Sequence, residues 1–335
     1  MKSLIIPIFV IYRGCPNRCV FCNERITAGN YPDRLTEETV RNICNRHLKN
    51  NRRKFDQIAF YGGNFTGIDR DYQSELLNIA QSYVDGGMVN SIRISTRPDY
   101  IDTDRLDLLK QYTVSTVEIG AQSMVDEVLH LSGRGHSSED VRTAVQLLKE
   151  KGFETGVHLM VGLPGDTRRR FEYTVEEIIR IRPDTVRIHP TIVFKNTLLS
   201  QSYRNGEYQP LTLDGAVDLC KNALLQFQGA GIPVIRLGLH TTPEMETNDN
   251  IIAGPFHPAF RSLVEGAIFL DKASNLLKSA HLKNTNVVFY VAPRDVSNLR
   301  GIKNRNIKIL KESFNLTKID VRENAKQERW SLTVV

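Results

Sequence analysis

Three cysteines, Cys15, Cys19 and Cys22, lie within eight residues and directly follow the apolar run of residues 4–11. They are separated by three and then two residues. Thiolates favour soft metal centres, and iron–sulfur clusters are held by cysteine runs of this kind. A [4Fe–4S] cube has four irons, so three ligands leave one iron open. The spacing therefore predicts a [4Fe–4S] cluster on these three cysteines.

A structural zinc site or an unligated loop is the alternative. Structural zinc sites usually combine two Cys or His pairs, and the sequence contains no second CxxC or HxxxH pair. The next cysteine, Cys44, falls on the apolar face of a helix that we expect after the N-cap Thr36, so we predict it in the core. Five cysteines, odd in number and clustered, fit a reducing, cytoplasmic location without disulfides.

The cysteine loop resembles the signature of the radical S-adenosylmethionine (radical SAM) superfamily, CxxxCxφC, with Phe21 as the aromatic residue before the last cysteine. The resemblance implies an enzyme with two cofactors, a [4Fe–4S] cluster and S-adenosylmethionine (SAM). The open iron would bind the amino and carboxylate groups of SAM. Reductive cleavage would then give a 5′-deoxyadenosyl radical that abstracts hydrogen from the substrate. An electron donor such as flavodoxin or ferredoxin is implied as a partner.

Short apolar runs alternate with amphipathic helical patterns, which is typical of βα units on a parallel sheet. The expected strands cover residues 4–11, 57–61, 91–95, 116–119, 154–161 and 185–189, with one more at 232–239. Most unusual polar residues follow these strands, at the end where barrels and open sheets build active sites. The pattern does not separate a barrel from an open sheet. The resemblance implies an α/β fold with a partial (β/α)6 TIM-like barrel.

The strand ends also resemble one branch of the superfamily, which holds the catalytic subunit of Elongator and relatives of oxygen-independent coproporphyrinogen III oxidase. The resemblance rests on residues 60–66, 94–99, 118–123, 133–136 and 161–165. It implies that Gly62 and Gly63 receive the SAM amino group, since glycines let backbone approach a ligand closely. Asn64 stands third in this motif, where the broad family often has Glu.

The same resemblance implies which residues contact the other parts of SAM. Gln122 would contact the ribose, and Arg134 would bind the carboxylate with its bidentate guanidinium. Ser95 would lie beside the methionine moiety. Val161 and Gly162 would flank the adenine.

The sequence assigns no catalytic residue. His189 and Lys195, at the end of the sixth expected strand, are candidates to face the substrate. His240 and His257 are further candidates for the mouth of the barrel. Each of the four reads equally well as a strand-end or surface residue without a role in chemistry.

With 335 residues, 41% of them hydrophobic, the chain is large enough for a sizeable core. We expect a core barrel over residues 1–240, a helical connection over 241–284 and a small basic α/β domain over 285–335. No apolar run approaches the roughly 18 residues of a membrane span, so no membrane is expected as a partner. Residues 281–335 carry eleven Lys and Arg against five Asp and Glu, which equals the net charge of +6 of the whole chain.

The basic C-terminal segment points to a polyanionic partner. Its expected order of strand, helix, helix and two strands, with Gly301-Ile302-Lys303-Asn304 between the helices, resembles a KH-type RNA-binding module. A small α/β cap with a solvated basic helix is the alternative. An RNA, such as a transfer RNA base, or a small metabolite or tetrapyrrole are the candidate substrates. A non-enzymatic iron–sulfur protein that binds nucleic acid is the remaining interpretation.

Overall fold

The computed structural model describes residues 4–16, 18–29, 31–50, 54–246, 249–283 and 285–335. The chain divides into two compact units. The first comprises Met1–Thr212 and Gln226–Phe256, and the second comprises Leu213–Leu225 and His257–Val335. Among the described helices, none combines the length and the apolar character that crossing a bilayer requires.

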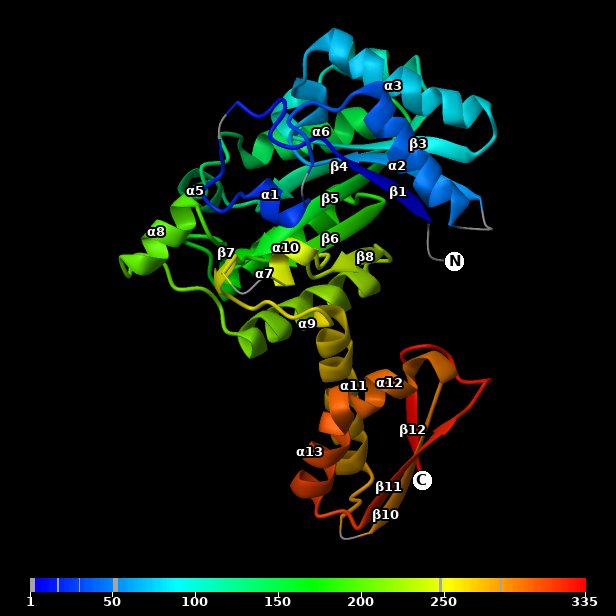
Figure 1. The fold of residues 1–335 in the computed structure, drawn as a ribbon. Helices are drawn as coiled ribbons and strands as arrows, with labels where there is room; N and C mark the ends of the chain where they lie inside the picture. The colour runs from blue at the N-terminus through cyan, green and yellow to red at the C-terminus, as the bar shows by residue number, and fades with distance from the viewer. Residues whose placement is uncertain (1–3, 17, 30, 51–53, 247–248, 284) are drawn as a thin grey trace. The chain divides into compact units, whose positions relative to one another are not determined.

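The first unit contains an open, fully parallel sheet of seven strands (Figure 1). Its strands, in spatial order, are β1 (Ile5–Phe9), β2 (Phe55–Tyr61), β3 (Val89–Thr96), β4 (Val114–Gln122), β5 (Glu154–Val161), β6 (Thr185–Pro190) and β8 (Val234–Leu237). Sequential strands pair with one another, as they do in a barrel that is not closed. The expected partial (β/α) barrel is confirmed, and the additional strand at 232–239 extends it as β8.

Helices lie between the strands of the sheet and after the last one. They are α1 (Glu24–Thr27), α2 (Glu37–Lys49), α3 (Arg70–Asp85), α4 (Thr103–Lys110), α5 (Asp126–Leu131), α6 (Ser138–Glu150), α7 (Arg168–Ile181), α8 (Leu198–Arg204), α9 (Leu213–Gly229) and α10 (Pro243–Glu246). Residues Leu213–Leu225 of α9 belong to the second unit. Local capping explains where several begin. Thr36 caps α2, and Ser137 forms a reciprocal capping box with Asp140 at the start of α6. Cys44 on α2 is fully buried, as predicted.

Successive side chains of each strand point to opposite faces of the sheet, so apolar and polar residues are sorted to different faces. Residues such as Ile58, Ile94 and Val117 are fully buried in the apolar core. The alternate positions carry polar residues, among them Arg93 and Glu118, so the inner face of the sheet is lined by polar groups. A second, two-stranded ribbon pairs β7 (Val193–Phe194) with β9 (Ile251–Ala253). These strands are too short for a sequence pattern to reveal.

The second unit has a three-stranded sheet in the order β11 (Lys318–Glu323), β10 (Asn286–Val291) and β12 (Leu332–Val334). Its helices are α11 (Phe260–Ser279), α12 (Val296–Arg300) and α13 (Arg305–Phe314). Apolar residues of α11, including Phe269, pack with Phe289 and Leu310 in one core. The expected order of strand, two helices and two strands is observed. The likeness to a KH-type module and the division at residues 240 and 284 stay predictions.

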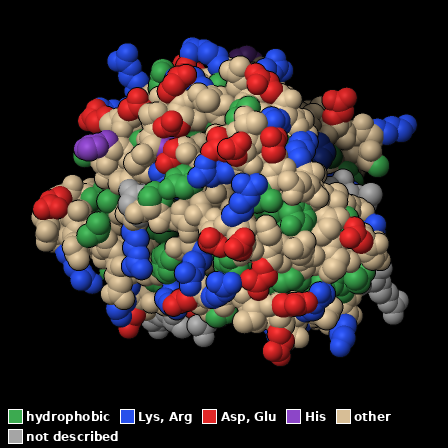
Figure 2. Space-filling model, turned by 90° about the horizontal axis from the view of Figure 1, so that it is seen from above, with side chains coloured by type: hydrophobic (Ala, Val, Ile, Leu, Met, Phe, Trp, Pro, Cys, Tyr) green, Lys and Arg blue, Asp and Glu red, His purple; other side chains and the backbone are tan. Residues whose placement is uncertain are grey.

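The two units differ in charge. Over the face shown in Figure 2, Lys and Arg side chains are mixed with Asp and Glu, without a large area of one sign.

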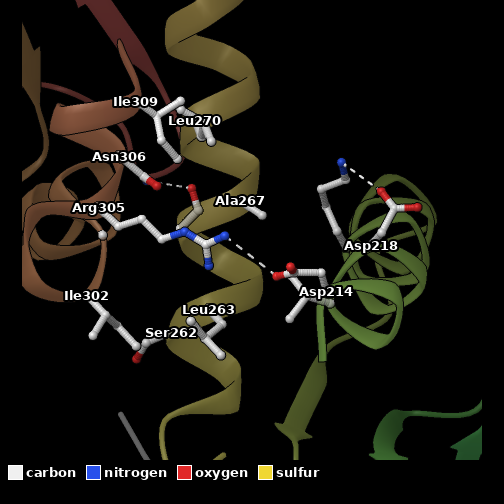
Figure 3. A pocket seen from close by; sticks show the side chains of 14 residues that line it. Asp214, Asp218, Ser262, Leu263, Ala267, Leu270, Ile302, Arg305, Asn306 and Ile309 are labelled. Atoms are coloured by element: carbon white, nitrogen blue, oxygen red, sulfur yellow. Dashed lines mark hydrogen bonds and ion pairs between the residues drawn. The ribbon is translucent and has the colours of Figure 1, made fainter. Parts of the chain in front are cut away.

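In the second unit, a cavity of about 190 Å³ lies against α11 and the start of α13. Figure 3 shows its lining, in which Leu263 and Ile309 are apolar and Arg305 lies 3.7 Å from Asp214. That ion pair is largely exposed, so it adds little to stability.

Candidate active site

The three-cysteine loop follows β1 at the end of the sheet where β2 and β3 also end. Cys15 is exposed, Cys19 is buried and Cys22 is partly buried. The Cys22 amide donates a hydrogen bond to the Cys19 carbonyl at 3.0 Å, which folds the loop back on itself. A backbone hydrogen bond of 3.1 Å from Val20 to Ser132 ties the loop to the segment after α5.

Burial raises the pKa of the Cys22 thiol well above its usual range, and the nearby Glu24 carboxylate adds to the increase. Metal coordination overcomes such a shift, because a coordinating thiol is deprotonated outright. Among the described residues, no three His, Cys, Asp or Glu side chains are arranged to hold one metal ion. A four-iron cluster does not require its three cysteine sulfurs to converge on one metal ion, because each cysteine would bind a different iron.

The Gly62-Gly63 turn lies against the cysteine loop. Both residues have positive φ, +79° and +57°, which favours glycine. A Cβ on Gly63 would overlap the Arg13 carbonyl oxygen and would lie 2.8 Å from the Val10 carbonyl oxygen. The turn therefore requires glycine because another backbone segment occupies the space of a side chain.

Glu24 joins these two segments, although sequence reasoning did not single it out. One carboxylate oxygen accepts a hydrogen bond from the Tyr12 amide, and the other accepts one from the Gly63 amide. Glu24 therefore fixes the start of the cysteine loop against the Gly-Gly turn. Its position two residues after Cys22 is the only feature that could have drawn attention to it.

The Asn64 side chain is fully buried and serves the protein itself. Its Nδ2 donates to the Gly14 carbonyl at 2.7 Å, while its Oδ1 accepts from the Thr96 hydroxyl and from the Arg97 amide at 3.1 Å. The structure thus gives this side chain a bracing role between three loops. Asn64 was expected as a cofactor contact, and its engaged side chain argues against a side-chain contact of that kind.

Arg134 and Gln122 meet around Gly120 on β4. Arg134 donates from NH1 to the Cys19 sulfur at 3.1 Å and from NH2 to the Gly120 carbonyl at 2.6 Å. A Cβ on Gly120 would lie 3.0 Å from Gln122 Nε2 and 3.2 Å from Arg134 NH2. Glycine at this position therefore leaves room for both side chains. Gln122 itself adopts φ +68° where the β4–β5 register is irregular.

Three polar atoms in this region are buried without a hydrogen-bond partner: Arg97 NH1, Gln122 Oε1 and Arg134 Nε. Such atoms are rare in native proteins and call for an explanation, such as a bound water, an ion or a catalytic role. Two are cationic donors and one is a neutral acceptor. Together they suit a ligand that carries both an anionic group and a hydroxyl or amine.

The remaining predicted contacts are Phe21 in the cysteine loop and three residues at the ends of β3 and β5. Ser95 is partly buried on β3, and Phe21 packs against the apolar cluster of Val193, Leu199 and Tyr208. Val161 is fully buried. The Gly162 amide donates to Asp166 Oδ2 at 3.0 Å, and its carbonyl accepts from the Tyr208 hydroxyl at 2.6 Å. Gly162 is thus already engaged on both backbone groups.

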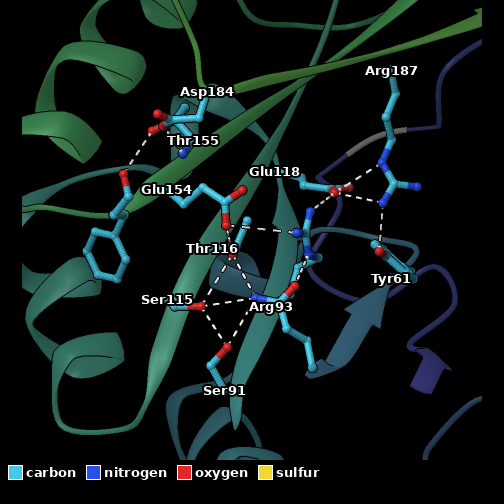
Figure 4. Close-up of polar contacts among 12 residues, drawn as sticks. Tyr61, Ser91, Arg93, Ser115, Thr116, Glu118, Glu154, Thr155, Asp184 and Arg187 are labelled. Atoms are coloured by element: carbon cyan, nitrogen blue, oxygen red, sulfur yellow. Dashed lines mark hydrogen bonds and ion pairs between the residues drawn. The ribbon is translucent and has the colours of Figure 1, made fainter. Parts of the chain in front are cut away.

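A buried polar network lines the inner face of the sheet below this end (Figure 4). Glu118 pairs with both Arg93 and Arg187, the latter at 2.8 Å. Arg187 also donates to the Tyr61 hydroxyl at 2.8 Å, and Arg93 donates to Gln57 Oε1 at 2.7 Å. The network joins β2, β3, β4 and β6, so it fixes the strands whose ends form the site.

We expect Glu118→Gln to lower the free energy of unfolding by about 3 kcal/mol, because it leaves two buried guanidinium groups without their shared carboxylate. Urea titration followed by circular dichroism measures the change. The control is Glu37→Gln, which breaks the exposed pair with Arg41 and should cost less than about 1 kcal/mol. Equal losses in the two variants would show that the buried network does not hold the strands.

Two histidines form a pair on the inner face of β5 and β6. His158 Nε2 and His189 Nδ1 lie 2.9 Å apart. Burial and the Arg187 cation lower the pKa of His158 to about 3, and burial also lowers the pKa of His189. Both rings are therefore neutral near pH 7. His189 Nε2 is buried without a partner, so its expected role toward the substrate stays a prediction.

The other candidate residues are more scattered. Lys195 is exposed and its carbonyl accepts from Asn23 Nδ2 at 2.8 Å, which places it beside the cysteine loop. His240 is exposed on the segment after β8. His257 belongs to the second unit, where its Nδ1 accepts from the Ala259 amide at 3.0 Å. These residues lie on three separate segments of the chain.

Comparison with known sequences covers most of the chain. The radical SAM superfamily matches residues 9–178, half of the chain, and the radical SAM C-terminal domain matches residues 183–268. Uncharacterized protein MJ0486 of Methanocaldococcus jannaschii is 26% identical over 246 residues, which cover 69% of this chain and 74% of that protein. The tRNA uridine(34) acetyltransferase of Methanocaldococcus infernus is 35% identical over 133 residues, 39% of this chain but 25% of its own length.

Solved structures share the fold. The archaeal Methanocaldococcus infernus Elp3 with an N-terminal deletion (1–46) aligns with a TM-score of 0.62 and 20% identity, covering 82% of this chain and 63% of that one. Coproporphyrinogen III oxidase from Escherichia coli, a radical SAM enzyme, aligns with a TM-score of 0.50 and 20% identity, covering 68% and 52%. The expected family is confirmed by the match over residues 9–178. The chain belongs to the radical SAM superfamily, whose enzymes use a [4Fe–4S] cluster and S-adenosylmethionine.

Proposed function

We propose that this enzyme binds its cluster through Cys15, Cys19 and Cys22, binds SAM across the ends of β2 to β5, and acts on an RNA. The observation that carries the site assignment is the contact of Arg134 with both Cys19 and the end of β4. One side chain thereby connects the metal-ligand loop with the strand ends that would hold SAM. The RNA is supported by the charge of the second unit.

The residues present fit both cofactors. Three thiols on one loop supply the soft ligands that an iron–sulfur cluster requires. The unpartnered donors on Arg97 and Arg134 suit anionic groups, and the unpartnered Gln122 oxygen suits a ribose hydroxyl. The glycines at 62, 63 and 120 keep side chains out of the space between these groups. Bound cofactors would give these three buried polar atoms hydrogen-bond partners without a change in the backbone.

A cluster held by Cys15, Cys19 and Cys22 would supply the one-electron chemistry that cleaves SAM in this superfamily. The chain's own residues hold and orient these reactants. Arg134 holds the Cys19 side of the loop, Glu24 holds its other side against the Gly-Gly turn, and the neutral His158–His189 pair offers an uncharged nitrogen to a substrate in the barrel. A flavodoxin or ferredoxin in the cytoplasm would provide the electron.

The second unit supports an RNA substrate. Lys303 and Asn304, both at positive φ, form a tight turn after Gly301, and α13 follows directly. Lys303, Arg305, Lys308 and Lys311 are all exposed around this turn. Basic groups on one short helix and its preceding loop can neutralise several phosphates. The relatives named tRNA uridine(34) acetyltransferase support tRNA as the RNA, although the chain matches only part of their length.

We expect the double variant Lys303→Gln, Lys308→Gln to weaken binding of tRNA about tenfold near 0.1 M salt and to make the salt dependence less steep, by about one unit of slope per lost phosphate contact. Filter binding at several salt concentrations measures both. The matched control is Lys318→Gln, Lys326→Gln, which removes two exposed lysines of the same unit outside the turn. If the wild type shows no salt-dependent binding to tRNA, the RNA proposal fails and a small-molecule substrate takes its place.

A further inference from the structure

Arg97 is a buried cation that is not among the SAM contacts predicted from the sequence. It follows β3 directly, and only 2% of its surface is exposed. Its Nε and NH2 donate to the two carboxylate oxygens of Asp99 at 2.9 and 2.8 Å. Its third nitrogen, NH1, is buried without a hydrogen-bond partner. Because Asp99 fixes the plane of the guanidinium, NH1 is held in one direction and its acceptor must come to it.

Two hydrogen bonds connect Arg97 to the cysteine loop. Its amide donates to Asn64 Oδ1 at 3.1 Å, and Asn64 Nδ2 donates to the Gly14 carbonyl at 2.7 Å. Gly14 directly precedes Cys15. On the other side, the register of β3 and β4 pairs Thr96 with Ile119. Arg97 therefore lies beside the strand end that carries Gly120, to which Arg134 is bound.

Electrostatics support the same placement. Burial alone would lower the pKa of Arg97, but the hydrogen-bonded Asp99 carboxylate raises it, and negative charge on the Cys19 and Cys15 sulfurs would add to the increase. The guanidinium thus lies within electrostatic range of two sulfurs of the loop. Arg134 already shows that a guanidinium in this region contacts a cysteine sulfur, at 3.1 Å from Cys19.

We propose that Arg97 donates its free NH1 to the sulfur atoms of the cluster and thereby raises the reduction potential of that cluster, with Asp99 as the counterion that limits the effect. This inference rests on the proposed assignment of Cys15, Cys19 and Cys22 as ligands. Hydrogen bonds to cluster sulfurs and the local charge are among the factors that set such potentials. Reduction adds one negative charge, so a nearby cation stabilises the reduced state.

Potentiometric titration of the reconstituted full-length protein without SAM, followed by electron paramagnetic resonance, tests the proposal. We expect the midpoint potential of Arg97→Met to be more negative than that of the wild type, because Asp99 then stands alone beside the cluster. The midpoint potential of Arg97→Lys should lie between the two, since lysine keeps the positive charge but lacks the planar set of donors of the guanidinium. Asp99→Asn should shift the potential in the opposite direction. Lys110→Met, which removes an exposed cation on α4, should leave it unchanged.

The outcomes separate this inference from the proposed function. A wild-type protein that takes up no iron overturns both. An intact cluster whose potential is the same in Arg97→Met, Asp99→Asn and the wild type overturns this inference alone. A raised dissociation constant for SAM in Arg97→Met at an unchanged potential also overturns it and assigns NH1 to the SAM carboxylate. If Arg97→Met does not fold, the shift in Asp99→Asn decides, because the Asp99 residue is exposed.

Discussion

Cys→Ala substitution at Cys15, Cys19 or Cys22 is expected to abolish 5′-deoxyadenosine formation from SAM. Each cysteine would bind a different iron, so two remaining ligands cannot hold a cube that is open at one corner. Anaerobic reconstitution with iron and sulfide, followed by iron analysis and chromatography after addition of dithionite, measures cluster content and SAM cleavage together. We expect the wild type to contain about four irons per chain, as a [4Fe–4S] cluster requires.

The remaining cysteines provide matched controls for this experiment. Cys44 and Cys220 are both fully buried in the apolar core. Alanine at either position should reduce stability through a small cavity but leave iron content and SAM cleavage intact. Cleavage that persists after loss of Cys15, Cys19 or Cys22 would contradict the ligand assignment. Loss of cleavage in the controls would show that the assay reports stability rather than ligation.

Gly14→Ala is expected to prevent cluster uptake, although it changes no ligand. Gly14 has φ +73°, and a Cβ there would overlap the Asn64 carbonyl oxygen and lie 2.7 Å from the Gly67 carbonyl carbon. Both are backbone atoms, so no side-chain rotation relieves the clash. The loop that carries Cys15 must then move away from β2. We expect most of the iron to be lost and the melting temperature to fall.

Gly87→Ala separates steric overlap from backbone strain. Gly87 has a nearly equal φ of +69°, but a Cβ at this position would meet nothing within 4 Å. Its substitution should therefore cost only the roughly 1–2 kcal/mol of an L-residue in the left-handed region and leave iron content unchanged. Iron content in Gly14→Ala equal to that in Gly87→Ala would mean that the cysteine loop tolerates displacement.

Much of the scaffold could be predicted from sequence because its determinants are local. The capping residues Thr36 and Ser137 act on amides three residues away, so the starts of α2 and α6 are correct. The predicted bounds of β5 (Glu154–Val161) match the observed ones, since apolar residues alternate at Val157, Leu159 and Val161 and glycines stand at 152 and 162. The three cysteines proposed as ligands could be singled out because they lie within eight residues on one loop.

The hydrogen bonds and ion pairs that hold the site together could not be predicted, because they join residues far apart in the chain. Glu118 contacts Arg93 and Arg187 across 25 and 69 residues of sequence, and Asn64 contacts Gly14 across 50. Nothing local distinguishes a strand arginine with a buried partner from one that faces solvent. The family motif suggested Asn64 as a cofactor contact, whereas the fold uses its side chain to hold loops together.

The sequence by itself determined the chemistry of this protein, through three thiols at a fixed spacing, and the order of its strands, through periodic burial. Only the tertiary structure decided which buried polar groups find a hydrogen-bond partner within the protein and which do not, as the contrast between Asn64 and Arg97 Nη1 shows. The physical reason is that hydrogen-bond satisfaction depends on strand register and loop packing, which are set by contacts between distant segments.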